Sequence, residues 1–453
     1  MPANTPLEAD YVIGGGGTAG LVLVSRLSED PNTSIIVLEV GKDLTQDSRI
    51  QIPALQTTLI GSDKDWQFQS IPQPSVNGRV IKSPEIETKT RSFAAIGHGV
   101  PAAKQGVQIV TEALVNRILF DAASNNTEIT ASGVEAPVHG QFYNIQARKE
   151  VILCAGALNS PKLLELSGIG NEDLLHQFDI PTTIHNPHVS ERLQDHLSTA
   201  ISFEAVDDIT TLEPPPPALM PILDFHPSNT QRTTTTQDSI DTFLPPTPDA
   251  RTNAIRNILS HQIAATCMMF MYLAQANLHK PQGNSFTGPL HPGNFLSLGF
   301  LASHPFSRGS VHIASSDPAA TPILDPRYLS HPLDLDIMTR NLLEVQKLHR
   351  VSPLSTYLKP NGRRNHPDAY IASIDAVKRC LVDTATTAFH YRGTVAMLPR
   401  EKGGVVDERL VVYGTRNLRV CDASVFPLIP AANIQATVYA VAERAADIIR
   451  GRV

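Results

Sequence analysis

The hydrophobic pattern at the start of the chain changes between two periods. The short run 10–14 has apolar residues at 11–13 and ends in a cluster of glycines, and the segment 18–30 then carries apolar residues at helical spacing. A second run, 34–38, is rich in β-branched residues and ends at Glu39. The order of strand, turn, helix and strand predicts a βαβ unit.

A second ordered region follows a long stretch of weak pattern. Residues 44–106 contain several prolines and little periodicity, so we expect loops there. Alternating apolar positions that begin at Val107, and recur at 133–138 and 142–147, predict successive antiparallel strands. The continuous apolar run 151–156 predicts a buried strand.

The second half of the chain predicts a further lobe that contains a sheet. Before it, a helix with Ser160 as its N-cap is expected to follow the strand 151–156. Proline- and threonine-rich composition between about 199 and 292 predicts exposed linkers. The most apolar stretch, 263–274, is too short to span a bilayer and is expected to form a buried helix. Apolar segments at 295–301 and 309–314 predict strands.

Length and composition narrow the class of protein. The 453 residues exceed the size at which one hydrophobic core stops growing, which favours two lobes. The balance of 37 basic against 44 acidic residues gives a net charge of −7 and no basic stripe for a nucleic acid. The four cysteines are widely spaced, so we expect buried free thiols and no metal site. No signal peptide is visible, and the prediction is a cytoplasmic protein without a membrane segment.

The glycine cluster has the spacing of a dinucleotide-binding fingerprint. Gly15, Gly17 and Gly20 form G-x-G-x-x-G between the predicted strand and helix. Glycines at these positions let a pyrophosphate approach the backbone at the positive end of the helix. Glu39 follows at the usual distance of about 20 residues, where a carboxylate accepts hydrogen bonds from ribose hydroxyls. This pattern favours FAD or NAD over NADP, with a ligand-free glycine turn as the alternative.

Four separated segments carry a more specific pattern. They are GALNSPKLLELSGIG at 156–170, RLQDH at 192–196, PFSRG at 305–309 and the C-terminal region 390–449. In these segments the chain resembles the glucose-methanol-choline (GMC) family of FAD-dependent alcohol oxidoreductases, and within it the aryl-alcohol oxidase branch. The resemblance implies FAD as the cofactor.

The same resemblance implies a mixed α/β architecture in two lobes. Residues 1–198 are expected to form most of a Rossmann-like FAD-binding lobe, and 199–387 a substrate-binding lobe built on an antiparallel sheet. Residues 388–453 are expected to return to the FAD-binding lobe and to carry the catalytic residues.

The C-terminal segments imply the catalytic pair. His390 begins a sequence, HYRGT, that looks like the family's HPxGT motif, with Tyr391 in place of the proline. A neutral imidazole can remove the hydroxyl proton of an alcohol while hydride leaves the carbon, and His390 is the candidate base. Asn433, at the end of PAAN, would hold the substrate oxygen, whereas His196 and Arg308 are expected to be architectural.

The resemblance also implies the residues that contact FAD. The strand 418–420 would return to the FAD-binding lobe and bring the residues after it near the cofactor. The full set of expected contacts is Gly15, Gly17, Thr18, Ala19, Gly20, Glu39, Val115, Asp422, Ala423 and Gln435.

One family segment is missing from this chain. Full-length members carry a glycine- and serine-rich stretch that wraps the flavin, and Gly97 and Gly99 are at best a remnant of it. Three interpretations therefore stay open. The first is an enzyme that oxidises a small-molecule alcohol to an aldehyde or ketone, in specialised-metabolite biosynthesis, as a monomer or homodimer. The others are a degenerate or truncated member that binds a ligand or partner without turnover, and an NAD-dependent dehydrogenase.

Overall fold

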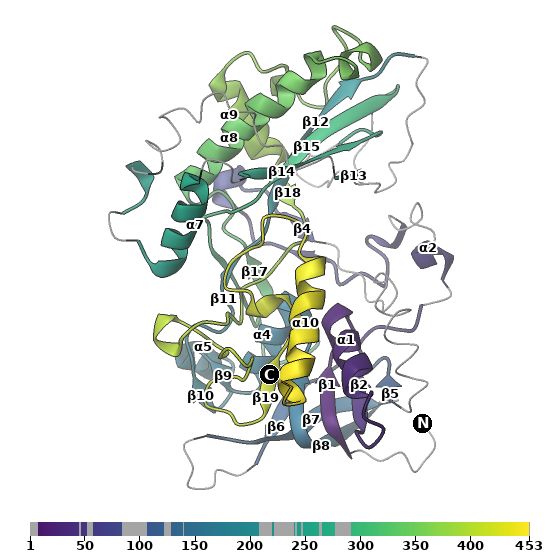
Figure 1. Cartoon of the computed structure of the whole chain (residues 1–453), viewed down its shortest axis with the longest axis vertical. Coiled ribbons are helices and arrows are strands. Elements are labelled where there is room, and N and C mark those ends of the chain that lie inside the picture. Colours follow the sequence, from purple (N-terminus) through teal and green to yellow (C-terminus); the bar gives the residue numbers. More distant parts are fainter. Residues whose placement is uncertain are drawn as a thin grey trace.

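The computed structural model shows two lobes that are stacked along the long axis of the molecule (Figure 1). It describes residues 8–44, 47–51, 58–83, 107–121, 128–138, 140–207, 220–221, 240, 242–245, 248–261, 265–276 and 291–452. Most of the predicted linker region between 199 and 292 lies outside these residues, as do Gly97 and Gly99.

A seven-stranded sheet forms the centre of the lower lobe within the described residues. Its spatial order is β5-β2-β1-β8-β7-β6, and β19 pairs with β8. The strands are β1 (Glu8–Gly14), β2 (Ile35–Leu38), β5 (Gln108–Val110), β6 (Arg117–Phe120), β7 (Ala131–Val138), β8 (Gln141–Leu153) and β19 (Leu418–Val420). The parallel pairing of β1 with β2 confirms the predicted βαβ unit and its Rossmann-like character.

Strand β8 corrects two of the predicted strands. The segments 142–147 and 151–153 belong to one continuous strand, whose first half pairs antiparallel with β7 and whose second half pairs parallel with β1, whereas 154–156 lead into the next helix. The segment that begins near Val107 contains two strands: β6 pairs antiparallel with β7, and β7 with β8, as predicted, whereas β5 runs parallel to β2, contrary to the prediction. Both errors have one cause: periodicity shows that a segment is extended but does not identify its partner.

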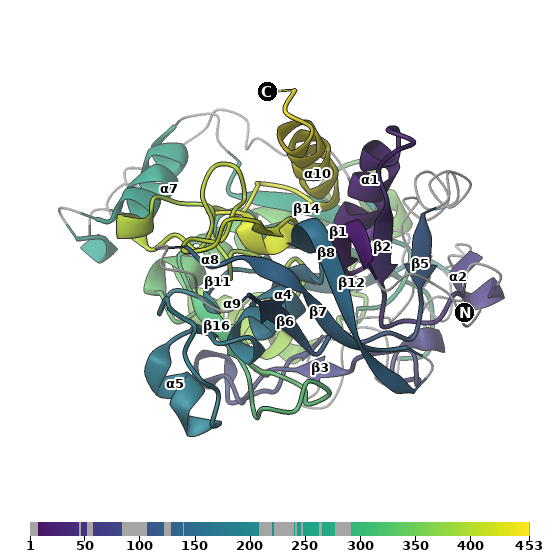
Figure 2. The same ribbon diagram turned by 90° about the horizontal axis from the view of Figure 1, so that it is seen from below.

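Two helices lie side by side on one face of this sheet (Figures 1 and 2). Helix α1 (Thr18–Leu27) begins at the glycine cluster, and α10 (Gln435–Ile449) closes the chain. Arg26 of α1 and Glu443 of α10 form an ion pair of 2.6 Å between Nε and Oε2.

Helix α4 (Gly156–Leu166) corrects another prediction. Ser160 is not its N-cap, because Ala155 holds that position and Pro161 lies inside the helix. The Ser160 hydroxyl instead donates to Asp422, in a distant segment, and accepts from the Ala155 N–H. A serine before a proline usually marks a helix start, but a buried long-range partner can recruit the same hydroxyl.

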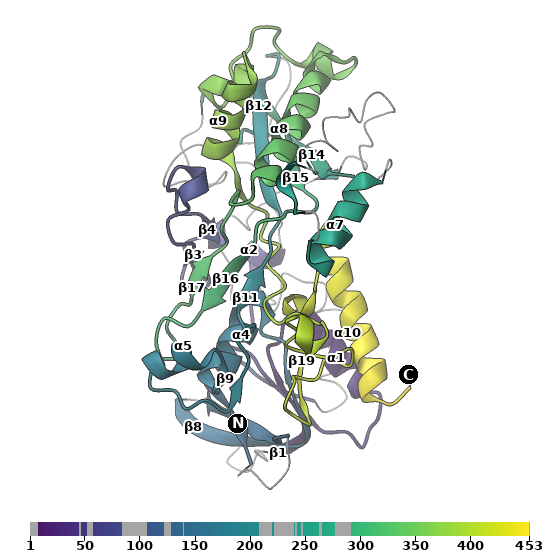
Figure 3. The same cartoon turned by 90° about the vertical axis from the view of Figure 1, so that its left-hand side faces the viewer.

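The upper lobe is built on an antiparallel sheet with the order β13-β14-β15-β12-β18. Its strands are β12 (Leu197–Glu204), β13 (Met220–Pro221), β14 (Cys267–Tyr272), β15 (Phe295–Ala302) and β18 (Thr386–Thr387). Helices α8 (Pro332–Lys347) and α9 (Ile374–Thr384) cover it (Figure 3). The predicted helix at 263–274 is therefore wrong: a short apolar run fits a buried strand as well as a helix, and this one pairs with β15.

A small sheet connects the two lobes. It is made of β11 (Glu191–Leu193), β16 (Gly309–His312) and β17 (Ile323–Asp325). Further short elements are α2 (Ser48–Gln51), β3 (Phe68–Gln69), β4 (Lys82–Ser83), β9 (Ile169–Gly170), α5 (Glu172–Gln177), β10 (Ile184–His185) and α7 (Ala250–Ser260). Single turns of 3-10 helix lie at Pro74–Val76, Leu348–Arg350, Leu354–Tyr357, Pro367–Tyr370, Arg400–Lys402 and Ala423–Val425.

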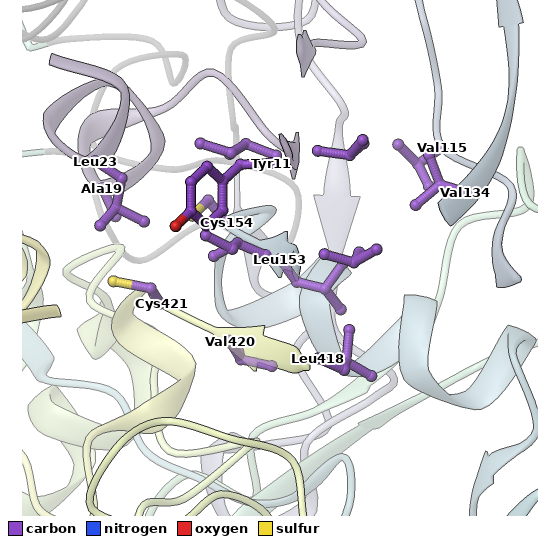
Figure 4. Packing of buried hydrophobic residues seen from close by; sticks show 14 of the residues in the cluster. Tyr11, Ala19, Leu23, Val115, Val134, Leu153, Cys154, Leu418, Val420 and Cys421 are labelled. Carbon is purple, nitrogen blue, oxygen red and sulfur yellow. The ribbon is translucent and has the colours of Figure 1, made fainter. Parts of the chain in front are cut away.

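Each lobe has its own hydrophobic core. The lower core packs α1 and α10 against the sheet, and Figure 4 shows Cys154 and Cys421 within it, next to Leu153 and Val420. The upper core lies between the second sheet and helices α8 and α9. All four cysteines are buried free thiols, as expected. In the described part of the chain, no helix has the length and apolar character needed to cross a membrane.

A partly buried ion cluster joins α4 to the connecting sheet. His312 Nδ1 lies 2.7 Å from Glu165 Oε1, and His312 Nε2 lies 3.2 Å from Glu191 Oε1. Burial disfavours the charged ring, but the two carboxylates outweigh that effect and raise the pKa of His312 to about 9. The Glu165 side chain is fully buried, so the protonated histidine offsets an otherwise costly negative charge.

We expect His312→Leu to destabilise the fold by about 3–5 kcal/mol at neutral pH, because it leaves a buried carboxylate without its partner. Since the pKa of His312 is raised, its contribution to the free energy of unfolding is complete below about pH 6.5 and is lost as the pH rises through about 9. Thermal unfolding from about pH 7 to 10 should therefore show the gap to wild type closing. His176→Leu, at an exposed histidine on α5, is the control and should shift the midpoint little. Equal midpoints for His312→Leu and wild type at pH 7 would contradict the assignment.

Candidate active site

A cavity of about 310 Å³ opens at the end of the parallel strands of the lower sheet. Its walls come from the turn after β1, the end of β2, the start of α4 and the segment after β19. Ligands of doubly wound sheets bind at this end of the strands. The cavity therefore lies where the glycine fingerprint predicts a dinucleotide.

The three fingerprint glycines have distinct structural reasons. Gly15 has φ +116°, and a Cβ there would lie 2.3 Å from the carbonyl oxygen of Cys154. A Cβ on Gly20 would lie 2.1 Å from the carbonyl oxygen of Gly15. At Gly17, by contrast, a Cβ would have no atom within 4 Å. Gly15 and Gly20 thus permit the close turn, and Gly17 leaves space open beside the cavity.

The start of α1 suits an anion. Gly17 is the N-cap, and no side chain caps the helix there. The first N–H groups of a helix have no partners within the helix, and the helix dipole favours negative charge at this end. Thr18 and Ala19, which follow, also line the cavity. The backbone of this turn therefore fits the pyrophosphate of a dinucleotide.

Glu39 ends β2 at the cavity wall. Its Oε2 accepts from the Gly16 N–H at 2.6 Å, and its Oε1 accepts from the Gly41 N–H at 2.9 Å. A carboxylate offers about four acceptor sites. Two backbone bonds therefore fix the side chain and leave capacity for ribose hydroxyls.

Asp422 fastens the C-terminal segment to α4. Its Oδ2 accepts from the Gly156 N–H at 2.9 Å and from the Ser160 hydroxyl at 2.5 Å, and its Oδ1 accepts from the Ser424 N–H at 2.8 Å. Burial raises the pKa of Asp422, while these hydrogen bonds act in the opposite direction. The Asp422 side chain therefore joins its own segment to α4 and holds Asp422 and Ala423 at the cavity wall.

Most of the expected FAD contacts line this cavity. Gly20 does not, because it packs against the preceding turn, and Gln435 lies exposed at the start of α10. The lining residues among the predicted contacts are Gly15, Gly17, Thr18, Ala19, Glu39, Val115, Asp422 and Ala423.

Sequence reasoning missed Lys162, which also lines the cavity. Its Nζ donates to the carbonyl oxygens of Pro318 and Ala320 at 2.7 Å each, and burial lowers its pKa to about 8. Its position within the 156–170 segment was the available signal, since α4 forms one wall.

His390 is held by a network that reaches across the two lobes. Its backbone N–H donates to Asp195 Oδ1 at 2.8 Å, and its ring Nδ1 lies 2.9 Å from Nδ1 of His196. Burial and the nearby Arg392 guanidinium lower the pKa of His390 to about 3. The imidazole is therefore neutral at physiological pH.

Asp195 is the centre of the same network. Besides the His390 N–H, its carboxylate accepts from the Thr387 hydroxyl at 2.5 Å and from the Tyr328 hydroxyl at 2.6 Å. The Tyr391 hydroxyl lies 3.2 Å from that of Tyr328. Tyr391, which stands where the family motif has proline, is thus a buried member of this cluster.

Asn433 lies apart from this network. Its side chain is exposed, and no hydrogen bond joins it to His390 within the described residues. The segment that carries it does reach the histidines, because the Pro430 carbonyl oxygen lies 2.9 Å from His196 Nε2.

Hydrogen bonds connect the residues that follow His390 to the cavity wall. The Gly393 N–H donates to the Ala423 carbonyl at 3.3 Å, and the Val395 N–H donates to the Ser424 carbonyl at 2.9 Å. The Thr394 hydroxyl donates to the Ala157 carbonyl on α4 at 2.7 Å. The segment that carries His390 therefore lies next to the segment after β19, which forms part of the cavity wall.

Two family models, both described as GMC oxidoreductase, match residues 80–198 and 305–442, which together cover more than half of the chain. The dehydrogenase mpl7 of Monascus purpureus is 27% identical, with 97% of this chain and 96% of that protein covered. Their alignment extends over 604 positions, whereas this chain has 453 residues, so the relative contains segments that are absent here.

Two solved structures show the same fold. An FAD-dependent oxidoreductase from Chaetomium thermophilum superimposes with a TM-score of 0.78 at 19% identity, with 98% of this chain and 99% of that chain covered. A fungal aryl-alcohol oxidase superimposes with a TM-score of 0.69 at 22% identity, with 99% of this chain and 100% of that chain covered.

We expect Gly17→Ala to weaken FAD binding about tenfold to a hundredfold, because a Cβ there enters the space through which the pyrophosphate approaches the backbone. The backbone at Gly17, with φ −75°, accepts alanine, so the thermal midpoint of the apoprotein should not change. Gly15→Ala is the contrast and should lower that midpoint, because its Cβ meets a carbonyl oxygen. Fluorescence titration gives the Kd for FAD, and an unchanged Kd in Gly17→Ala would place the pyrophosphate elsewhere.

Proposed function

Because the chain belongs to the GMC oxidoreductase family, whose cofactor is FAD, we propose that it oxidises the CH–OH group of a small-molecule alcohol to an aldehyde or ketone. The observation that carries the proposal is the neutral, anchored His390 on backbone that adjoins the dinucleotide cavity. FAD, when bound, supplies the acceptor for the hydride that leaves the carbinol carbon.

The residues of the cavity fit the ADP half of FAD. The uncapped start of α1 and the open space at Gly17 suit the pyrophosphate, and Glu39 suits the ribose. Asp422 and Ala423 would lie beside the remainder of the cofactor. In this proposal the protein binds and orients FAD mainly through backbone.

His390 would act as the general base. An alcohol releases hydride readily only when its hydroxyl proton is removed, and a positioned imidazole can accept that proton. The low pKa of His390, caused first by burial and then by Arg392, keeps the ring in its basic form. Asn433 would hold the alcohol oxygen, a role that rests on the family pattern and on its position shortly after Pro430.

A second candidate function is ligand binding without turnover. The observation that favours it is the length difference from the relative aligned over 604 positions. If the absent segments include the residues that enclose the flavin, the cavity would bind a nucleotide but would not support hydride transfer. Alcohol-dependent bleaching of bound FAD distinguishes the two functions.

We expect the purified protein to show a flavin spectrum that bleaches when a primary alcohol is added without oxygen. His390→Ala should retain FAD but bleach at least about a hundredfold more slowly, because a general base contributes about 10²–10⁴-fold. His176→Ala, at an exposed histidine of α5, is the matched control and should bleach like wild type. FAD that no alcohol in a broad panel reduces would favour the binding function.

The pH dependence offers an independent check. With its pKa lowered to about 3, His390 stays unprotonated as the pH falls from about 8 to about 5. We expect kcat/KM, which reports the free enzyme, to stay level over that range. A fall in kcat/KM with a midpoint near 6.5, the ordinary value for histidine, would contradict the observed environment of the ring.

A further inference from the structure

His196 and His390 form a pair through the same ring atom. Their Nδ1 atoms lie 2.9 Å apart, and the rings meet edge to face with an interplanar angle of 82°. A hydrogen bond between two nitrogens needs one donor and one acceptor. The protonation of one ring therefore determines that of the other.

The surroundings of His196 determine which nitrogen carries its proton. Its Nε2 lies 2.9 Å from the Pro430 carbonyl oxygen and 3.2 Å from the Ser303 carbonyl oxygen. Carbonyl oxygens can only accept, so Nε2 must be the donor. The residue is fully buried, and burial, Arg392 and His390 together lower its pKa to about 2. A neutral ring protonated at Nε2 has a lone pair at Nδ1.

The tautomer of His390 follows from this lone pair. Because His196 Nδ1 can only accept, His390 Nδ1 must donate, and it carries the single proton of the neutral ring. His390 Nε2 then holds the free lone pair, and it has no hydrogen-bond partner among the described residues.

The charged groups near the pair do not compete for these ring atoms. The Asp195 carboxylate accepts from the backbone N–H of His390, and the Arg392 guanidinium donates to the backbone carbonyl of His390. Both contacts hold the backbone of His390, and neither involves a ring nitrogen.

We propose that His196 is a positioning residue that holds His390 in the Nδ1-protonated tautomer and so makes His390 Nε2 the atom that accepts the substrate proton. The kinetic part of this proposal rests on the proposed function, whereas the tautomer does not. When Nε2 gains the proton, the Nδ1–H bond to His196 remains, so the ring keeps its orientation in both protonation states. The alcohol O–H bond breaks, and its proton moves to Nε2.

Two substitutions isolate the acceptor at the Nδ1 position. His196→Asn can place an amide oxygen where Nδ1 lies, and His196→Phe keeps a flat ring without an acceptor. Both lose the Nε2 contacts to Pro430 and Ser303 equally. Of the two variants, only His196→Asn offers an acceptor to His390.

The direct test is NMR of protein labelled with ¹⁵N-histidine, with the His390 signals assigned from His390→Ala. At neutral pH we expect a protonated Nδ1 and an unprotonated Nε2 at His390 in the wild type and in His196→Asn. In His196→Phe we expect a mixture of tautomers. An Nε2-protonated His390 in the wild type, or the same single tautomer in His196→Phe, would overturn the proposal.

Kinetics add a readout that a merely structural role would not produce. We expect His196→Phe to slow anaerobic reduction of bound FAD by alcohol about tenfold to a hundredfold at unchanged KM, and His196→Asn to recover most of the rate. Equal losses in both variants would overturn the positioning role. If the NMR pattern holds but no alcohol reduces FAD in the wild type, the tautomer assignment stands and the proposed function fails.

Discussion

The buried carboxylate of Asp422 joins two parts of the chain on which the cavity depends. It accepts from Gly156 and Ser160 of α4 and from Ser424 of its own segment. A buried carboxylate is tolerated only when donors replace the water that it has lost. Because α4 and the segment after β19 both form cavity walls, this carboxylate determines how far apart the walls stand.

The same constraint extends to the candidate base. The carbonyls of Ala423 and Ser424, which follow Asp422, accept from the backbone N–H groups of the segment 393–395. On the other side, the backbones of Gln194 and Arg392 exchange two hydrogen bonds, of 3.0 and 3.1 Å. His390 is thus held between the cavity wall and the segment that carries His196. Backbone pairing positions His390, and the neighbouring His196 ring determines which of its ring nitrogens carries the proton.

Local patterns predicted the parts of the structure that depend on local physics. The turn at Gly15 followed from the sequence because its backbone conformation and its close approach to Cys154 both exclude a side chain. The rest could not be predicted, because it depends on partners that are distant in the sequence. Ser160 looked like a helix cap until its bond to Asp422 was seen, and 263–274 looked like a helix until its pairing with β15 was seen. His196 looked architectural, because nothing in the sequence places it beside His390.

We propose that this fold holds an alcohol between His390 and a bound FAD so that the carbinol C–H bond breaks. Single-turnover reduction of the FAD-loaded protein by a primary alcohol, compared with the same alcohol deuterated at the carbinol carbon, tests it most directly. We expect bleaching to be slower with the deuterated alcohol, and at least about a hundredfold slower in His390→Ala than in the wild type. Equal rates for both alcohols would mean that C–H cleavage does not limit reduction, and FAD that neither alcohol reduces would contradict the account.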